Sequence, residues 1–255
     1  YRQTPEGARD YIVPSRIQPG SFYALPQSPQ LLKQILMVSG MDRYFQVVRC
    51  FRDEDLRADR QPEFTQMDLE MSFVSQADVL GVIEGTMQYV LKEVLGRELT
   101  LPIQRMSFDE AMNRFGTDAP DLRFGLELVD AGPVAAKTEF RVFRDALAAG
   151  GQVKGIRIPG GAARSRKEIT DLEDYAKQFG AKGLAWAKVK EGQLDGPIAK
   201  FFGDGPRQEL LGAFAAESGD LLVFVADAKP SVVAASLDKV RRPLGKQHGL
   251  TAPSV

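Results

Sequence analysis

The chain has 255 residues, 44% of them hydrophobic, which is enough for more than one ordinary domain and a sizeable core. Its 33 basic and 34 acidic residues nearly cancel, and this balance argues against a protein that coats nucleic acid non-specifically. A single cysteine, Cys50, excludes a disulfide framework, and a single histidine, His248, excludes a metal site built from several histidines. Without a long apolar run or a signal peptide, the sequence predicts a cytoplasmic protein that has no membrane partner.

The first predicted elements are a turn and a helix. Proline and glycine within Thr4–Asp10 are typical of a turn. Further on, Ser28 has the residue type of a helix N-cap, and Pro29 that of a first helical position. We expect the helix to run to Gly40, and Lys33 on it would by itself be an ordinary surface lysine. Its apolar residues recur at helical spacing: Leu31, Leu32, Ile35 and Leu36.

The segment Phe51–Phe73 predicts a hairpin whose strands flank a charged and polar loop, Asp55–Glu63. Side chains on a strand alternate between its two faces, so Arg52 and Glu54 share a face in the first strand. One face of the second strand carries Phe64, Gln66, Asp68, Glu70 and Ser72. Pairing the strands would gather an arginine, a glutamine and three carboxylates on one wall. Alternation alone favours the solvated face of an antiparallel sheet, on which charged side chains are usually only hydrated.

Two helices are predicted after the hairpin. The first, Ser75–Gly96, has apolar residues at helical spacing. The second begins at a capping box, Ser107–Glu110, and ends at Gly116.

From Leu128 onward, short β-rich runs alternate with helical ones, and glycine and proline concentrate between them. The predicted strands are 140–143, 153–158, 184–189 and 221–225. The predicted helices are 167–179, 208–216 and a last one that begins at Pro230 and ends at Arg241–Arg242. We expect this last helix to return the chain to the first domain.

Two features of this region could suggest binding chemistry. Gly160 and Gly161, followed by basic residues, lack the spacing of a phosphate-binding loop, which favours a capped turn with Ser165 as the N-cap. The only tryptophan, Trp186, is expected to pack in the core of its strand.

The hairpin resembles motif 2 of class II aminoacyl-tRNA synthetases, in the form found in bacterial-type aspartyl enzymes. That form has an F-R-D-E strand, a basic loop and an E-F-T-Q-x-D-x-E strand, and all three stand here between Phe51 and Phe73. The chemistry agrees, because activating an amino acid brings its carboxylate close to the α-phosphate of ATP. A guanidinium can bridge both anions, and Arg52 is the only residue on the predicted wall that can do so.

The resemblance extends along the whole chain. Thr4–Asp10 is similar to the loop that closes over the amino acid, Ala24–Gln34 to a substrate-binding segment, and Asp118–Arg123 to a D-x-P-D-L-R link. The region from Leu128 is similar to a domain that is inserted into bacterial aspartyl enzymes and also occurs in the tRNA-dependent amidotransferase. The resemblance implies an α+β fold, part of an antiparallel-sheet catalytic domain with an inserted α+β domain. The implied domains are 1–127 (catalytic), 128–229 (inserted) and 230–255 (return to the catalytic domain).

Residue roles follow from the resemblance, position by position. Arg52 is the implied catalytic residue, because it would hold both the α-phosphate and the amino-acid carboxylate. The implied aspartate-binding residues are Glu6, Ser28, Gln30, Lys33, Arg52, Gln66 and Asp68. The implied ATP-binding residues are Arg52, Asp53, Glu54, Gln61 and Phe64. In the loop, Arg57 and Arg60 would meet the phosphates or the acceptor end of tRNA, and Lys33 would engage the side-chain carboxylate of aspartate.

The implied activity is that of an aspartate–tRNA ligase acting on L-aspartate, ATP and tRNA(Asp), with tRNA(Asn) as a further candidate and a homodimer as the assembly. The family's motif 3 arginine is not found in the sequence, and no metal ligands are assigned, so Mg2+ is expected to bind outside this chain. We therefore expect an internal section of a longer synthetase that is inactive by itself. The alternative is a non-catalytic paralogue that acts as a tRNA- or protein-binding module.

Overall fold

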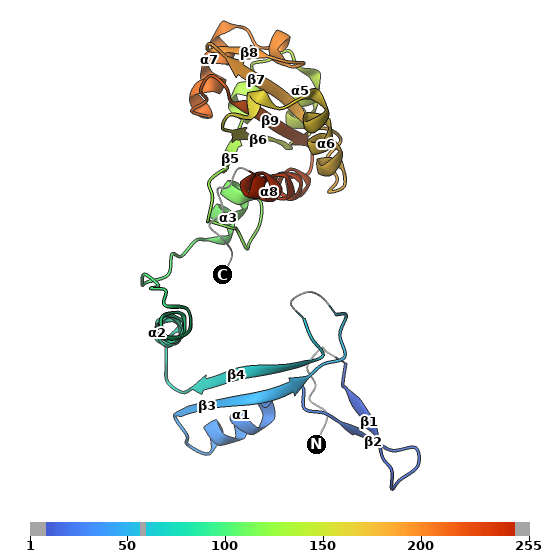
Figure 1. The fold of residues 1–255 in the computed structure, drawn as a ribbon, viewed down its shortest axis with the longest axis vertical. Coiled ribbons are helices and arrows are strands. Elements are labelled where there is room, and N and C mark those ends of the chain that lie inside the picture. Colours follow the sequence, from blue (N-terminus) through green and yellow to red (C-terminus); the bar gives the residue numbers. More distant parts are fainter. Residues whose placement is uncertain (1–8, 57–59, 248–255) are drawn as a thin grey trace. The chain divides into compact units, whose positions relative to one another are not determined.

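The computed structural model describes residues 9–56 and 60–247, which divide into two compact units, Tyr1–Gln104 and Arg105–Val255. Figure 1 shows the helices and strands of both units. The architecture is α+β with antiparallel sheets, as predicted. In the described part of the chain, no helix is both long and apolar enough to span a membrane.

The first unit consists of two hairpins and two helices (Figure 1). Its elements are β1 Ile12–Pro14, β2 Phe22–Ala24, α1 Gln30–Val38, β3 Arg43–Phe51, β4 Glu63–Met71 and α2 Gln76–Leu95. Strands β3 and β4 pair antiparallel, with Cys50 opposite Phe64 and Gln46 opposite Asp68. Helix α1 packs against this hairpin. Cys50 is fully buried, as the sequence predicted.

The capping of the two helices in this unit differs. Helix α2 lies within the predicted range Ser75–Gly96. Ser75 and Asp78 form its capping box, and Gly96 is its C-cap in the left-handed conformation. The prediction that Ser28 caps α1 is wrong. The helix begins one residue later, so Pro29 is its N-cap and makes no side-chain cap hydrogen bond. Ser28 Oγ instead accepts a bond from the Gln30 N–H at 3.3 Å.

The second unit is a five-stranded antiparallel sheet, in the order β5-β6-β9-β7-β8, with helices on both faces. Its strands are β5 Leu128–Asp130, β6 Gln152–Ile158, β7 Ala185–Lys190, β8 Gln193–Asp195 and β9 Leu221–Asp227. Its helices are α3 Phe108–Phe115, α4 Gly132–Ala135, α5 Arg141–Ala148, α6 Arg166–Lys177, α7 Asp204–Ala213 and α8 Pro230–Gln247. Short 3-10 turns lie at Gly161–Ala163 and Ala199–Phe201.

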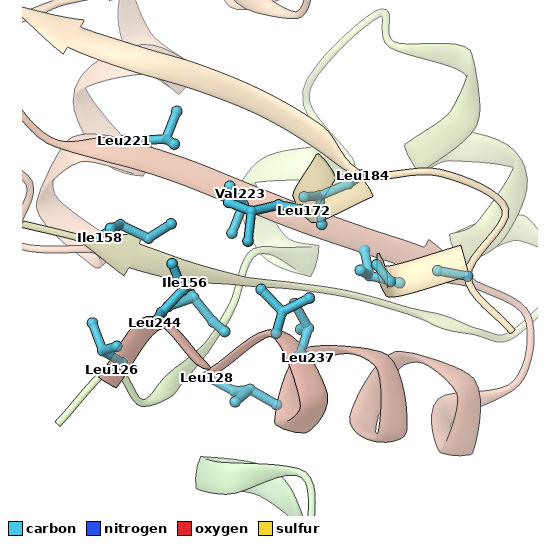
Figure 2. Packing of buried hydrophobic residues seen from close by; sticks show 14 of the residues in the cluster. Leu126, Leu128, Ile156, Ile158, Leu172, Leu184, Leu221, Val223, Leu237 and Leu244 are labelled. Carbon is cyan, nitrogen blue, oxygen red and sulfur yellow. The ribbon is translucent and has the colours of Figure 1, made fainter. Parts of the chain in front are cut away.

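Alternation along β9 creates two apolar clusters, one on each face of the sheet. Leu221, Val223 and Val225 contribute to the cluster covered by α6 and α8, whose packing is shown in Figure 2. Leu222 and Phe224 contribute to the opposite cluster, with α4, α5 and α7. Because both faces are covered, this strand reads as a continuous apolar run rather than as an alternating one.

Helices α3 and α8 pack together in the second unit. Gly116, which ends α3 as predicted, has φ of 75°, and a Cβ there would lie 2.4 Å from the Ala234 carbonyl oxygen of α8. Only glycine suits both the conformation and the close approach. Helix α8 also packs on α6, β6 and β9. The boundary between the two compact units falls after Gln104. The predicted domain boundaries at 127 and 229 stay predictions.

Several predicted element bounds need correction. The strand predicted at 140–143 is the start of α5, because Phe143 and Ala146 recur at helical spacing and are both buried. Helix α8 does not end at Arg241–Arg242 but continues to Gln247 with Pro243 inside it, since Leu244 is fully buried in the core. Helix α7 begins at Asp204 rather than at 208.

The remaining predictions for local structure are largely confirmed. Ser165 forms a capping box with Glu168 at the start of α6. Ser107 caps α3 by accepting from the Glu110 N–H, but the Glu110 carboxylate pairs with Arg114. The side chain of Trp186 packs, partly buried, against the cluster shown in Figure 2.

Candidate functional site

The candidate site is the polar wall of the β3–β4 hairpin. The register places Phe64, Gln66, Asp68 and Glu70 on one face of β4, and all four side chains are half-buried. Their partners across the ladder are Cys50, Val48, Gln46 and Tyr44. Arg52 follows directly after β3, and its N–H donates to the Pro62 carbonyl at 2.9 Å, which extends the pairing into the loop.

Lys33 is the centre of an ion cluster on this wall. From α1, its Nζ donates to Asp68 Oδ1 at 3.0 Å and lies 3.1 Å from Glu70 Oε2. Its side chain is 9% exposed, so it is not the ordinary surface lysine that helical periodicity alone suggests. Burial lowers the pKa of the Lys33 ammonium, but bonds to Asp68 and Glu70 raise it by more, so the net pKa lies above the ordinary value.

This cluster retains capacity to bind a ligand. An ammonium has three N–H donors, and the two carboxylates take two of them. Asp68 Oδ2 is buried and has no hydrogen-bond partner in the described part of the chain. A buried carboxylate oxygen without a donor is costly, so a bound ammonium group would be stabilised there.

A second part of the site is a cavity of about 430 Å³ where the strands leave the sheet. It is lined by Arg52, Glu54, Asp55, Leu56, Arg60, Gln61 and Phe64. The Arg52 guanidinium lies 5.1 Å from the centroid of the Phe64 ring, within the range of a cation–π contact. Arg52 Nε is buried without a hydrogen-bond partner among the described residues. The cavity thus combines an aromatic face with a half-buried guanidinium that can donate hydrogen bonds to an anion.

Further ion pairs surround this cavity. Arg60 Nη1 lies 3.6 Å from Glu54 Oε2, and Arg9 Nε lies 3.8 Å from Asp53 Oδ2. Arg9 and Asp53 are also joined by an isolated β-bridge of their backbones. This bridge connects the chain just before β1 to the residue after Arg52. The ion pairs are half-exposed or more, so each contributes little to stability.

The other predicted side chains lie on or beside the wall. Cys50 Sγ donates to Gln66 Oε1 at 3.4 Å. Gln30 is the first residue of α1, three positions before Lys33, and Ser28 precedes that helix. Glu6, Arg57 and His248 lie outside the described residues. The structure therefore brings together Lys33, Asp68 and Gln66 from the predicted aspartate set, and Arg52, Glu54, Gln61 and Phe64 from the ATP set.

Sequence reasoning missed two features of the site. Alternation places Glu70 on the wall but gives it no role, and in the structure it is the second partner of Lys33. The sequence signal that could have indicated this role is the position of Glu70 two residues after Asp68, on the same face of the strand. Gln27, which is buried, donates from Nε2 to Asp10 Oδ1 and so links a residue two positions before β1 to the segment before α1. Nothing in the sequence spacing indicates that link.

Comparisons with known proteins show which family the sequence belongs to. Residues 1–248 match the family model described as tRNA synthetases class II (D, K and N). The chain is 57% identical over 250 residues to "Aspartate--tRNA ligase" of Macrococcus caseolyticus, covering 98% of this chain and 42% of that protein. It is 57% identical over 248 residues to "Aspartate--tRNA(Asp/Asn) ligase" of Bacillus subtilis, covering 97% of this chain and 42% of the relative.

A third relative, "Aspartate--tRNA ligase" of Exiguobacterium sibiricum, is 56% identical over 255 residues, which is 100% of this chain and 43% of the relative. The chain thus spans less than half the length of the curated relatives that it matches. Since the family model covers residues 1–248, the chain belongs to the class II tRNA synthetases of the D, K and N group.

Proposed function

We propose that the protein containing this sequence is an aspartate–tRNA ligase, and that the β3–β4 wall holds its two small substrates. The observation that carries the proposal is the placement of the Lys33 cluster and the Arg52–Phe64 cavity on a single hairpin. One part suits an amino acid with an acidic side chain, and the other suits a purine nucleotide. The relatives that bear the name aspartate--tRNA ligase support the same assignment.

Aspartate would bind at the Lys33 cluster. The third N–H of Lys33 would donate to its side-chain carboxylate, and the buried Oδ2 of Asp68 would accept from its ammonium. Gln66, beside Asp68 on the same face, would line the pocket, together with Gln30 and Ser28 on the α1 side. Selectivity for an acidic substrate follows, because a neutral side chain would leave the third N–H of Lys33 without a charged partner.

ATP would bind in the cavity, with its adenine ring on Phe64 and its amino group donating to Glu54. Gln61 and Asp53 flank this position, and Arg60 would meet the phosphates or the acceptor end of tRNA. Arg57 keeps its predicted role toward the phosphates or the acceptor end of tRNA, and Glu6 its predicted role in binding aspartate, although both lie outside the described residues.

Arg52 would carry the catalysis. A carboxylate oxygen of aspartate attacks the α-phosphorus of ATP, the bond to the bridging oxygen breaks, and pyrophosphate leaves with the bond electrons. The Arg52 guanidinium would hold both anions in line and stabilise the charge that develops on the phosphorus oxygens. In the second step, a hydroxyl at the 3′ end of tRNA attacks the activated carbonyl carbon, and AMP leaves.

Mg2+, cytoplasmic location and a homodimer also belong to the proposal. The described residues contain no group of three or more metal-ligating side chains, so Mg2+ would be held by residues outside them. The tRNA partner is tRNA(Asp), with tRNA(Asn) as a second candidate, because relatives of both printed names match equally well.

The test is aspartate-dependent exchange of pyrophosphate into ATP by the protein that contains this sequence. Arg52→Lys should lower kcat by at least ~100-fold, because a lysine cannot bridge two anions bidentately. The matched control is Arg49→Lys, an exposed arginine 2.7 Å from Glu63, which should keep exchange within about 2-fold.

A second variant separates the two halves of the site. Lys33→Met should raise the KM for aspartate by at least ~10-fold and leave the KM for ATP within about 3-fold, because it removes only the cation of the amino-acid pocket. If the wild-type protein binds tRNA but shows no exchange, the proposal fails, and the binding-module alternative takes its place.

A further inference from the structure

A hollow of about 520 Å³ opens in the second unit, between α5, the end of β9 and the start of β7. These elements are labelled in Figure 1. Its volume lies within the range of small-molecule sites. The buried rings of Phe143 and Phe224, whose centroids are 5.8 Å apart, contribute to its lining. Small residues leave the space open: Ala146, Ala149, Gly183, Ala185, Ala226 and Ala228.

The charges that line the hollow are mostly negative. Asp145, Glu173 and Asp227 contribute carboxylates, and Lys182 contributes a cation. Asp145 is exposed and pairs with Arg141 on its own helix at 3.2 Å. Glu173 likewise pairs with a lysine of its own helix at 3.0 Å. Asp145 and Glu173 are therefore already neutralised by cations of their own helices, which leaves Asp227 as the carboxylate with the weakest partner.

Asp227 differs from the other two carboxylates because its side chain is only 8% exposed. Its Oδ1 accepts from the Lys229 N–H at 2.9 Å. Its Oδ2 lies 3.6 Å from Lys182 Nζ, on a side chain that is 82% exposed. A buried carboxylate needs close, well-directed partners, and a solvated lysine at this distance compensates it only weakly. Oδ2 can thus form a closer pair with another cation.

We propose that this hollow binds an amine carried on an apolar body, with the ammonium at Asp227 and the hydrocarbon against Phe143 and Phe224. The ligand class is a primary amine on a hydrocarbon ring or stem, which combines charge-assisted hydrogen bonding with apolar burial. Neither aspartate nor ATP has this chemistry, so the site is separate from the proposed function and does not depend on it. Lys182 would leave Asp227 when the ligand enters.

The test is a titration of the 255-residue chain with phenethylamine, followed by the backbone amide NMR signals. Saturable shifts should appear at Lys182–Ala185 and Ala226–Ala228. The neutral analogue 2-phenylethanol should bind at least ~10-fold more weakly, since it offers the same ring without the charge. A blocked Gly-Lys-Gly peptide forms the second arm. Binding in either arm supports the site, and the tighter arm shows whether the amine is free or belongs to a side chain.

Three variants test which charged side chain binds the ammonium of the ligand. Asp227→Asn should weaken phenethylamine binding at least ~10-fold while keeping an oxygen for the Lys229 N–H. Lys182→Ala should strengthen binding by about 2- to 3-fold, because it removes the competing cation. Asp145→Asn is the matched control on the exposed rim and should change binding by less than about 2-fold.

Ala149 is exposed and lines the hollow, so Ala149→Phe should block the opening of the hollow and abolish phenethylamine binding without disturbing the core. It keeps the proposal testable if Asp227→Asn fails to fold. Each variant must retain the wild-type fluorescence of Trp186. The proposal is overturned if no lining amide shifts at millimolar phenethylamine, if 2-phenylethanol binds as tightly, or if Ala149→Phe leaves binding unchanged.

Discussion

The two units are stabilised by different interactions. In the second, both faces of a five-stranded sheet are covered, and each has a continuous apolar cluster. In the described part of the first, the buried residues are Gln27, Pro29, Lys33 and Cys50. Two of these, Lys33 and Cys50, make polar contacts with residues of the candidate site. The local order of the site therefore depends on charged and hydrogen-bonded groups more than on an apolar core.

The helices show the same contrast. Helix α2 has no buried residue, whereas α6 buries Ile169, Leu172 and Ala176. In α1 the buried residue is Lys33, and Leu32 is 66% exposed. Apolar periodicity thus predicts where a helix forms, but it does not determine how much of the helix is buried.

The largest expected effect is the loss of a leucine from the second unit. Leu237 of α8 is fully buried, so Leu237→Ala should lower the free energy of unfolding by about 2–5 kcal/mol. The matched change in the first unit, Leu32→Ala, should cost less than about 0.5 kcal/mol. Urea unfolding followed by Trp186 fluorescence measures the second unit, which holds the only tryptophan, and the urea dependence of amide exchange in α1 measures the first. Equal costs for the two variants would contradict the contrast between the units.

Arg241 is the polar exception inside the second unit. It is fully buried. Its guanidinium donates to the carbonyls of four residues: Asp121, Phe124, Gly125 and Leu126. Its Cζ lies 4.7 Å from the ring centroid of Phe115 and 4.4 Å from that of Phe124. Burial lowers its pKa from the ordinary value. This one side chain therefore ties α3 and the following segment to α8.

Arg241→Met should lower the free energy of unfolding of the second unit by about 2–4 kcal/mol, because it leaves buried carbonyls without a donor. Arg242→Met is the neighbouring control. Its side chain is 41% exposed, and its buried partner Asp238 keeps a second cation, because Lys239 Nζ lies 3.5 Å from Asp238 Oδ2. The variant should therefore cost less than about 1 kcal/mol in the same urea assay. A similar cost for both variants would mean that the carbonyl contacts do not stabilise the unit.

The same capping box occurs in both units, so one mutation can be compared in two settings. Ser165 caps α6 and Ser75 caps α2, each with a reciprocal bond to the third helical residue. Ser165→Ala and Ser75→Ala should each cost about 1 kcal/mol locally.

The two cap variants should differ in how far that cost spreads. The loss at α6 should lower the urea midpoint of the whole second unit, because that helix belongs to its core. The loss at α2 should appear only as faster amide hydrogen exchange in its first turn, because none of its residues is buried. A shifted urea midpoint in Ser75→Ala would show that α2 is energetically coupled to the second unit.

The sequence predicted the hairpin and its polar wall because side chains on a strand alternate with a period of two. The N-cap residues Ser107 and Ser165 likewise indicated the starts of α3 and α6. The strand predicted at 140–143 was wrong, because a short run with two phenylalanines fits a strand as well as a helix. The structure shows that the buried residues of this segment recur at helical spacing. Helix α8 continues beyond Pro243 because Leu244 packs in the core, although a proline inside a helical pattern usually marks its end.

Long-range polar contacts were beyond prediction. The sequence could place Lys33 on a helix and Asp68 and Glu70 on a strand, but only the docking of α1 on the hairpin brings Lys33 to both carboxylates. Arg241 gave no signal, because its carbonyl partners lie more than a hundred positions earlier in the chain. The hollow at Asp227 was missed for the same reason, since its walls come from separate elements.

The smallest expected effect is on pH dependence, and it belongs to the second unit. A hydrogen bond from the Arg123 guanidinium lowers the pKa of Asp121 from 3.8 to about 2. A carboxyl with a lowered folded-state pKa contributes stability above its unfolded-state pKa, and that contribution is lost as the pH falls from about 4 to about 2. The contribution should stay below about 1 kcal/mol, because Arg123 is half-exposed and solvent screens the pair.

Asp121→Asn should therefore make the second unit slightly less stable at pH 6 and leave it close to wild type at pH 2. The measurement is the urea midpoint from Trp186 fluorescence at both values, with Asp174→Asn, an exposed carboxylate on α6 that pairs with Lys177, as the control. A cost that persists unchanged at pH 2 would show that the effect does not come from the carboxylate charge, because protonation removes that charge as the pH falls to about 2. The bond from Arg241 to the Asp121 carbonyl cannot explain such a cost, since the asparagine variant keeps that carbonyl.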